Sequence, residues 1–189
     1  MKIERATLDD QIEILALEQT IFNDMDLDVY DVLSQGDVQK AWQKAVAQSA
    51  KSRYHYSRAL VAKDDNSQIM GVAFGYPDNE ELDLDNAIQA VLADEYSYHR
   101  WLFEDSEVFD NEWYLDSIVV SENARGKGIG KQLLLASEKR ALNENKKTIG
   151  LNVDDHNPKA KKLYELMGYQ AVGRIQIGKH NYTHMQKSI

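Results

Sequence analysis

Residues 125–130 read Arg-Gly-Lys-Gly-Ile-Gly, and they join an apolar stretch to a segment with helical periodicity. Glycines let the backbone come close to a ligand, and the free N–H groups at the start of a helix attract phosphate. Arg125, Lys127 and Lys131 add positive charge at the same end. The stretch predicts a pyrophosphate-binding loop, and the alternative is a flexible strand–helix turn that binds nothing.

The spacing of these glycines excludes two familiar phosphate loops. The dinucleotide fingerprint requires Gly-x-Gly-x-x-Gly, whereas the glycines here stand at every second position. The Walker loop requires Gly-Lys-Ser/Thr, and here Lys127 is followed by Gly128. A pyrophosphate ligand would therefore be held by a loop of another type.

The elements around the loop alternate between strand and helix. Residues 113–120 are rich in aromatic and β-branched residues and predict a strand. Residues 129–143 predict a helix whose core-facing residues are Ile129, Leu133, Leu134, Ser137 and Ala141. A strand over 148–153, a helix over 159–167 and two strands over 170–177 and 182–187 follow. This order requires at least one parallel pair with a crossover.

The first half of the chain predicts further strands and helices. Residues 2–6 alternate as a short strand, and Thr7 with Asp10 resembles a capping box. The next helix is expected to carry Ile12, Leu15 and Ile21 along one side. Helices over residues 37–51 and 85–98, and strands over 58–63 and 68–75, complete the prediction. The fold class is α/β, or α+β by some schemes, with a mixed twisted sheet in a single domain over residues 1–189.

Composition narrows the class of protein. Cysteine is absent, which excludes disulfides, cysteine-based zinc sites and a thiol nucleophile. No apolar run approaches membrane-spanning length, so we expect no membrane partner and a cytoplasmic location. The formal net charge is −9, which argues against nucleic-acid binding. Residues 78–112 hold 12 acidic residues and one basic residue, Arg100.

Two blocks of sequence together resemble one protein family. Arg-x-x-Gly-x-Gly after an apolar strand is similar to the acetyl-CoA motif of the GNAT superfamily of N-acetyltransferases. The later residues Asn157, Ala160, Leu163, Tyr164 and Glu165, followed by Gly168 and Tyr169, resemble that family's second block. The opening residues 3–10 resemble its first strand and helix. Residues 22–56 and 76–112 match poorly, in segments that vary with the acceptor.

The resemblance implies the GNAT fold, acetyl-CoA as cosubstrate and an N-acetyltransferase that acts by direct attack in a ternary complex. Backbone groups of the central strand would hold the pantetheine arm, with the oxyanion donor near Val119 or Val120. The implied acetyl-CoA site comprises Ile118, Val119, Val120, Arg125, Gly126, Lys127, Gly128, Ile129, Gly130, Lys131 and Asn157. Asn157 also fits the N-cap of the helix that follows. Many relatives form dimers, and this sequence leaves the oligomeric state open.

Two residues are predicted to be catalytic. Tyr164 stands at the family's tyrosine and is expected to protonate the leaving thiolate, or else to pack as a structural tyrosine. Asp116 is the carboxylate within the strand over 113–120, where period 2 would place Tyr114, Asp116, Ile118 and Val120 on one face. Asp116 could act as a direct base, act through a water or bind the ammonium group. Glu112 is the alternative residue for this role.

The acceptor is expected to be a small cationic amine or a lysine-bearing peptide. The segments that should rim its site are acidic, and Tyr98 and Trp101 lie among them. His180 and His184 share a strand face, but the absence of a nearby carboxylate partner in the sequence predicts no metal site. Two rival functions are a non-catalytic acyl-CoA-binding regulator and a protein-interaction module.

Overall fold

The computed structural model describes residues 1–189 and contains a seven-stranded sheet in the order β1-β2-β3-β4-β5-β7-β6. Neighbouring strands are antiparallel except β4 and β5, which are parallel. The strands are β1 Lys2–Arg5, β2 Ala59–Lys63, β3 Ile69–Pro77, β4 Trp113–Val120, β5 Thr148–Asp154, β6 Gln170–Ile177 and β7 His180–Ser188. The predicted mixed sheet with one crossover is confirmed.

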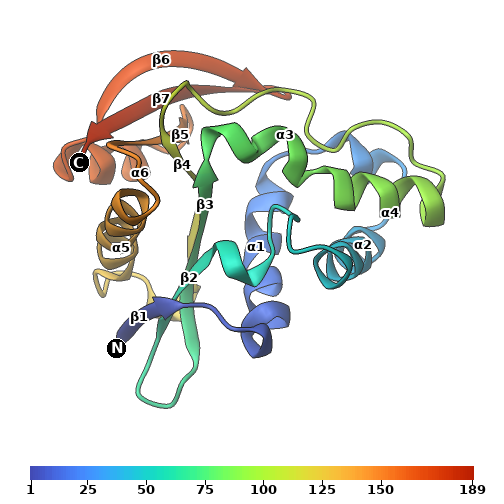
Figure 1. Cartoon of the computed structure of the whole chain (residues 1–189), viewed down its shortest axis with the longest axis horizontal. Coiled ribbons are helices and arrows are strands. Elements are labelled where there is room, and N and C mark those ends of the chain that lie inside the picture. Colours follow the sequence, from blue (N-terminus) through green and yellow to red (C-terminus); the bar gives the residue numbers. More distant parts are fainter.

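Helices cover both faces of the sheet (Figure 1). One face carries α1, α2 and α4, and the other carries α5 and α6. The α-helices are α1 Gln11–Asp24, α2 Gln35–Gln48, α3 Glu81–Leu84, α4 Asn86–Tyr96, α5 Ile129–Asn143 and α6 Pro158–Leu166. None of them is both long enough and apolar enough to cross a membrane.

The start of α1 confirms the predicted capping box, and of the predicted apolar face Leu15 and Ile21 pack in the core but Ile12 does not. The Asp10 carboxylate accepts hydrogen bonds from the Thr7 N–H at 2.8 Å and from its hydroxyl at 2.9 Å. Ile12, however, is 70% exposed, while Ile14, Leu15, Glu18 and Phe22 are buried. At about 100° per residue, Ile12 lies beside Leu15 but about 100° from the centre of this buried stripe. The buried residue Glu18 interrupts the apolar pattern, so the pattern alone does not identify the buried face of α1.

The predicted cores of the other helices are confirmed. On α5 the predicted core residues Ile129, Leu133, Leu134, Ser137 and Ala141 are all buried. Helix α2 begins two residues earlier than predicted because the Ser34 hydroxyl accepts a hydrogen bond from the Asp37 N–H at 3.2 Å. It ends at Gln48, and its buried face is Val38, Ala41, Trp42, Ala45 and Val46.

A bulge in β4 changes which side chains share a face. Phe74 pairs with Ser117 and Gly75 with Leu115, so Asp116 is an extra residue in β4. Ser117 therefore points to the α1 face, where its hydroxyl donates to Glu18 at 2.9 Å. Ile118 and Val120 instead pack on the α5 face. The prediction that Asp116 and Ile118 share one face is wrong for this reason.

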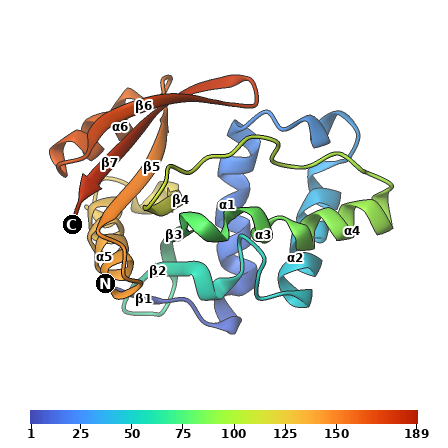
Figure 2. The ribbon, with the colours of Figure 1, turned by 45° about the horizontal axis from the view of Figure 1, so that its top comes forward.

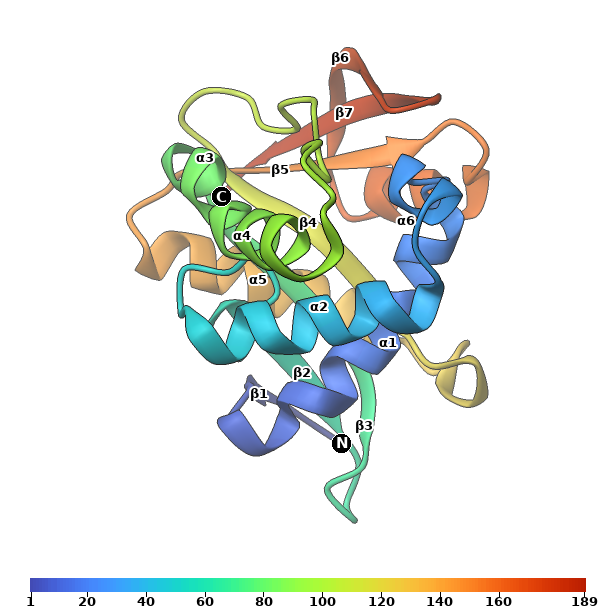
Figure 3. The ribbon, with the colours of Figure 1, turned by 90° about the vertical axis from the view of Figure 1, so that its right-hand side faces the viewer.

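Strands β4 and β5 separate shortly after they meet. Their pairing is confined to Trp113–Leu115 against Ile149–Leu151, and β4 continues to Val120 without a neighbour on that edge. Figure 3 shows the two strands diverging toward α1 and α6. Figure 2 shows the β6–β7 hairpin passing over the same end of the sheet. The free edge of β4 opens a space within the sheet layer.

Candidate active site

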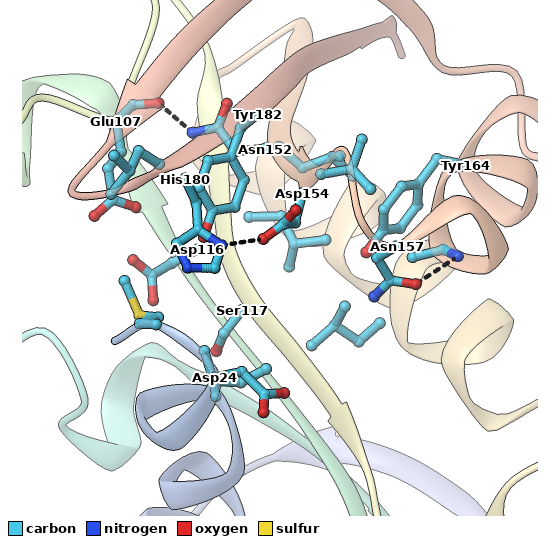
Figure 4. A pocket seen from close by; sticks show the side chains of 18 of the residues that line it. Asp24, Glu107, Asp116, Ser117, Asn152, Asp154, Asn157, Tyr164, His180 and Tyr182 are labelled. Carbon is cyan, nitrogen blue, oxygen red and sulfur yellow. Dashed lines mark hydrogen bonds and ion pairs between the residues drawn. The ribbon is translucent and has the colours of Figure 1, made fainter. Parts of the chain in front are cut away.

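A cavity of about 500 Å³ fills the space between the diverging strands. Its walls come from the end of α1, from β4 and β5, from α6 and from the β6–β7 hairpin. In Figure 4, Glu107, Asp116 and Asp24 lie on one side of the cavity, and Tyr164 and Asn157 lie on the other. Segments from both ends and the middle of the chain therefore meet at one place.

The lining of this cavity is strongly negative. It includes the carboxylates of Asp24, Glu107, Asp116 and Asp154, and it contains no lysine or arginine. The lining also contains two ionisable imidazoles, those of His156 and His180. A cavity with one sign of charge and low-dielectric walls concentrates ions of the opposite sign. The site is therefore electrostatically suited to a cation.

Tyr164 on α6 presents an unpaired hydroxyl to the cavity. Its side chain is 7% exposed and lines the cavity, and its hydroxyl makes no hydrogen bond within the protein. Burial raises the pKa of Tyr164 to about 12. The phenol therefore keeps its proton throughout the neutral range.

Asn157 holds the start of α6 and still has a free group. Its side-chain oxygen accepts a hydrogen bond from the Ala160 N–H at 3.1 Å, and Pro158 is the first helical residue. Its side-chain nitrogen makes no hydrogen bond within the protein, and the residue lines the cavity. The N-cap role expected from the sequence is confirmed, and the amide nitrogen remains available to a ligand.

Asp116 lines the cavity but is held from behind by Arg53. One carboxylate oxygen accepts a hydrogen bond from Arg53 at 2.7 Å and another from the Tyr76 hydroxyl at 3.3 Å. The other oxygen is buried without a partner, and the side chain is 3% exposed. Burial raises the pKa of Asp116, and the nearby Arg53 guanidinium opposes that rise.

Arg53 is the centre of a buried charge cluster. The guanidinium binds Asp85 through two hydrogen bonds of 2.8 Å and also contacts Glu107 at 3.3 Å. The ring of Phe103 lies over it at 4.5 Å. Three carboxylates, counting Asp116, thus share one cation, and this cluster is called the Arg53 cluster below. Burial, and after it the repulsion between neighbouring carboxylates, favours the protonated forms of Glu107 and Asp116.

Glu107 is a candidate functional residue that sequence reasoning missed. It lines the cavity and accepts a hydrogen bond from the Tyr114 hydroxyl at 2.9 Å. Burial and the neighbouring Asp116 raise the pKa of Glu107 to about 8, although Arg53 opposes the rise. It stands within the acidic segment, where no local pattern separates it from the other carboxylates.

Glu112, the substitute base considered from the sequence, lies outside the cavity. It is fully buried, accepts hydrogen bonds from the Phe109 N–H and the Gln186 amide at 2.8 Å each, and lies 3.0 Å from His184. Gly150 makes room for it, because a Cβ there would lie 1.8 Å from the carboxylate. Its contacts are those of a structural carboxylate.

The histidines of β7 do have carboxylate partners, contrary to the premise of the sequence analysis. His184 is fully buried against Glu112, as above. His180 lies 2.9 Å from Asp154 through Nδ1 and 3.4 Å from Asp26 through Nε2. His156 lies 2.9 Å from the other oxygen of Asp154. The contacts of His180 and His184 join segments that are distant in sequence, so no local spacing could reveal them.

The glycine-rich loop precedes α5 and is open to solvent. Gly126 and Gly128 have φ of 78° and 76°, in the left-handed region that glycine tolerates best. A Cβ at either position would meet nothing within 4 Å. No side chain caps α5, so the N–H groups of its first turn remain free. Arg125, Lys127 and Lys131 are exposed beside them.

The loop adjoins the free edge of β4. A Cβ at Gly130 would lie 4.0 Å from Val120 and 3.8 Å from Leu163 of α6, so the start of α5 abuts both elements. From Asp116 to Val120, β4 is paired with β3 alone, and an extended ligand can bind its other edge as an added strand does. Ile129 is buried in the core, so its side chain is not available to a ligand.

Comparisons with known proteins agree with this geometry. The model of a family described as the acetyltransferase (GNAT) family matches residues 21–169. A solved acetyltransferase structure is 36% identical, with 100% of this chain and 99% of that chain covered and a TM-score of 0.86. An N-acetyltransferase structure from Staphylococcus aureus Mu50 is 28% identical, with 99% and 100% covered and a TM-score of 0.88.

Curated relatives match a shorter part of the chain. An uncharacterized N-acetyltransferase of Bacillus subtilis, YycN, is 34% identical over 70 residues, which are 37% of this chain and 45% of that protein. The chain matches less than half the length of the curated relatives.

Proposed function

Because the chain belongs to the acetyltransferase (GNAT) family, we propose that it transfers an acetyl group from acetyl-CoA to a cationic primary amine. The amine is a small molecule or the side chain of a lysine-bearing peptide, and it attacks the thioester directly in a ternary complex. The observation that carries the choice of amine is the cavity, whose lining has four carboxylates and neither lysine nor arginine.

The free edge of β4 and the loop before α5 form the proposed acetyl-CoA site. The phosphates meet the N–H groups of residues 126–131 and the charges of Arg125, Lys127 and Lys131. The pantetheine arm follows the backbone of Ile118, Val119 and Val120, and the free amide nitrogen of Asn157 binds near the thioester. Support comes from the open glycines, the uncapped helix and the unpaired strand edge.

Tyr164 is the proposed acid that protonates the thiolate of CoA. A pKa of about 12 lies about 3.5 units above an ordinary thiol, so proton transfer is uphill at reference values. Burial disfavours both anions, however, and the same desolvation that raises the pKa of the phenol also raises that of a thiol beside it. The unpaired hydroxyl facing the cavity supports this role.

Asp116 is proposed to act through its charge. Arg53 holds one of its oxygens in place, and the carboxylate attracts the ammonium group. Glu107 adds to this attraction only where it is ionised, since its pKa is about 8. The Arg53 cluster becomes more negative as the pH rises through the pKa of Glu107, about 8, because three ionised carboxylates then surround one guanidinium. This charge concentrates cationic amines near the cavity and favours their binding over the binding of neutral analogues.

A matched series of acceptors tests the proposal. Putrescine, aminobutanol and aminobutyrate present the same primary amine with a distal cation, a hydroxyl or a carboxylate. We expect acetyl-CoA-dependent release of CoA with all three, and kcat/KM at least about tenfold higher for putrescine at low salt. Release of CoA with none of a wide amine panel, or a preference for aminobutyrate, would contradict the proposal.

Two variants separate cavity charge from overall charge. Asp24→Asn removes a cavity carboxylate that has no hydrogen bond or ion pair, so the change leaves the packing intact. We expect it to lower the preference for putrescine over aminobutanol. Asp94→Asn removes an exposed charge on α4, outside the cavity, and should leave that preference unchanged.

A further inference from the structure

A histidine–aspartate pair lies in the cavity, apart from the Arg53 cluster. His180 begins β7 and Asp154 ends β5, and their side chains meet with Nδ1 2.9 Å from Oδ2. Both residues line the cavity. In Figure 4, His180 lies between the Asp116 side and the Tyr164 side.

The surroundings of Asp154 determine which nitrogen of His180 carries the proton. Burial alone would raise the pKa of Asp154, but hydrogen bonds from the His156 N–H and from His180 outweigh it and lower that pKa. The carboxylate is therefore ionised and can only accept hydrogen bonds. Nδ1 of His180 must donate to it, which leaves the lone pair of a neutral imidazole on Nε2.

Nε2 of His180 is available to a substrate. Its one neighbour in the protein is the Asp26 carboxylate at 3.4 Å, and Asp26 is 69% exposed. The His180 side chain is 21% exposed, whereas Asp116 is 3% exposed and is held by Arg53 and Tyr76. Of these two groups, His180 is the one that a bound amine can reach.

The groups facing His180 favour its protonated form. Asp154 from β5 and Asp26 from the segment after α1 are anionic, and their hydrogen bonds raise the pKa of His180. The rings of His156 and Tyr182 lie 6.1 Å and 6.4 Å from the His180 ring. Imidazole is the side chain whose ordinary pKa lies closest to neutral, so it can accept a proton and release it again within one catalytic cycle.

We propose that His180, held in position by Asp154, accepts the proton that the acceptor amine must lose before it attacks. This assignment rests on the proposed acetyl transfer. Asp154 is then a positioning residue, since it contacts the imidazole and fixes its tautomer. The arrangement divides the work, because the Arg53 cluster attracts the ammonium group and the His180–Asp154 pair removes its proton.

The protons balance over the reaction. The ammonium gives one proton to Nε2 of His180, and the free amine forms a C–N bond to the acetyl carbon. The C–S bond then breaks, and the thiolate takes the phenol proton of Tyr164. The new amide nitrogen loses its second proton, which restores the phenol through solvent, and His180 releases the first proton to solvent. The net products are the acetylated amine, CoA thiol and one proton.

The pH dependence of kcat with saturating putrescine tests the assignment. In the wild type, kcat should rise with pH as His180 loses its proton. His180→Gln should lower kcat by about a hundredfold or more and abolish that acid limb. Asp154→Asn should move the limb to lower pH, because the carboxylate that raises the pKa of His180 is gone. Added imidazole should partly restore a His180→Ala variant.

His99→Gln is the control. His99 is exposed and does not line the cavity, so its loss should leave kcat within about twofold. Titration of the imidazole signals by NMR, without substrate, gives an independent readout. The pKa of His180 should lie above the ordinary range and should fall in Asp154→Asn.

The outcomes distinguish this assignment from the proposed function. A wild type that binds acetyl-CoA but acetylates no amine would overturn both. Turnover with an unchanged acid limb in His180→Gln would overturn the assignment alone. One nitrogen or oxygen atom from each of Asp154, His156 and His180 lies within 4.8 Å of those of the other two, so each assay is repeated with EDTA. Activity that EDTA removes and Zn²⁺ restores would make His180 a metal ligand and contradict the role proposed here.

Discussion

The glycine-rich loop over residues 125–130 and the Arg53 cluster flank the same strand, β4, yet they are built in different ways. The loop offers backbone N–H groups at two left-handed glycines and exposed basic side chains. The Arg53 cluster consists of buried side chains from four separate segments. The first uses residues adjacent in sequence, and the second uses contacts up to 63 residues apart.

This difference determines how each region responds to mutation. Backbone groups cannot be removed by changing a side chain, so the loop should tolerate the loss of any one charge. A buried guanidinium that faces three carboxylates has no substitute, and its loss leaves uncompensated charge in a low dielectric. The Arg53 cluster should therefore show large losses of stability, and the loop should show small changes in affinity.

Arg53→Met should have the largest effect on stability. We expect a loss of about 3–5 kcal/mol in the free energy of unfolding, measured with urea, because the carboxylates lose their shared cation. Burial already raises the pKa values of Glu107 and Asp116, and without that cation they rise further above the unfolded values. The loss should therefore be smaller near about pH 5, where they can protonate, than near about pH 8.

Arg100→Met is the control for this change. Arg100 pairs with Asp28 and Glu104 at the surface and is 58% exposed. Its loss should cost no more than about 1 kcal/mol. Equal losses in the two variants would show that the buried Arg53 cluster contributes no more to stability than a surface ion pair does.

Tyr164→Phe should have the largest effect on the chemical step among changes on the α6 side of the cavity. The substitution removes one hydroxyl without a hydrogen bond in the protein, so stability should change little. We expect kcat to fall about a hundredfold, with KM for acetyl-CoA nearly unchanged. Since the pKa of Tyr164 is about 12, the wild type should show no basic limb from this residue near neutral pH. A kcat equal to that of the wild type would assign Tyr164 to packing.

Gly150→Ala tests the packing that holds Glu112. The new Cβ would lie 1.8 Å from a Glu112 oxygen, so the strand or the carboxylate must shift. We expect a loss of about 1–3 kcal/mol in thermal or urea unfolding. Gly36→Ala in α2 is the contrasting case, because its Cβ would meet only the Ser34 hydroxyl at 3.8 Å. That variant should gain about 0.5–1 kcal/mol, and a loss there as large as at Gly150 would contradict this account.

Lys127→Ala should have the smallest effect. The side chain is exposed, so we expect KM for acetyl-CoA to rise only severalfold, by about 0.3–1 kcal/mol, and the rise should shrink at high salt. Lys139→Ala, exposed near the other end of α5, should leave KM unchanged. A loss of stability in Lys127→Ala would show that the lysine serves the fold instead.

The same contrast explains what the sequence could predict. The strand over residues 113–120, the helix over 129–143 and the strand over 170–177 match β4, α5 and β6, because local periodicity and glycine spacing encode them. The bulge at Asp116 was not predicted, since it depends on the register with β3.

The partners of the cavity residues were also not predicted. Arg53 stands 32 residues from Asp85, and His180 stands 26 residues from Asp154. No local pattern marks such pairs. The sequence therefore indicated Asp116 and Tyr164 as site residues, but it did not indicate that Arg53 holds Asp116 or that Glu107 and His180 face the same cavity.

Calorimetric titration with acetyl-CoA tests the central claim most directly. Gly128 has φ of 76° and open space around it, so Gly128→Asn keeps a residue that tolerates this conformation, while Gly128→Glu adds a negative charge at the start of α5. We predict that the wild type binds, that the Asn variant binds within severalfold, and that the Glu variant binds at least about tenfold more weakly. No binding by folded wild-type protein, or equal binding by the Glu variant, would contradict the proposed acetyl-CoA site.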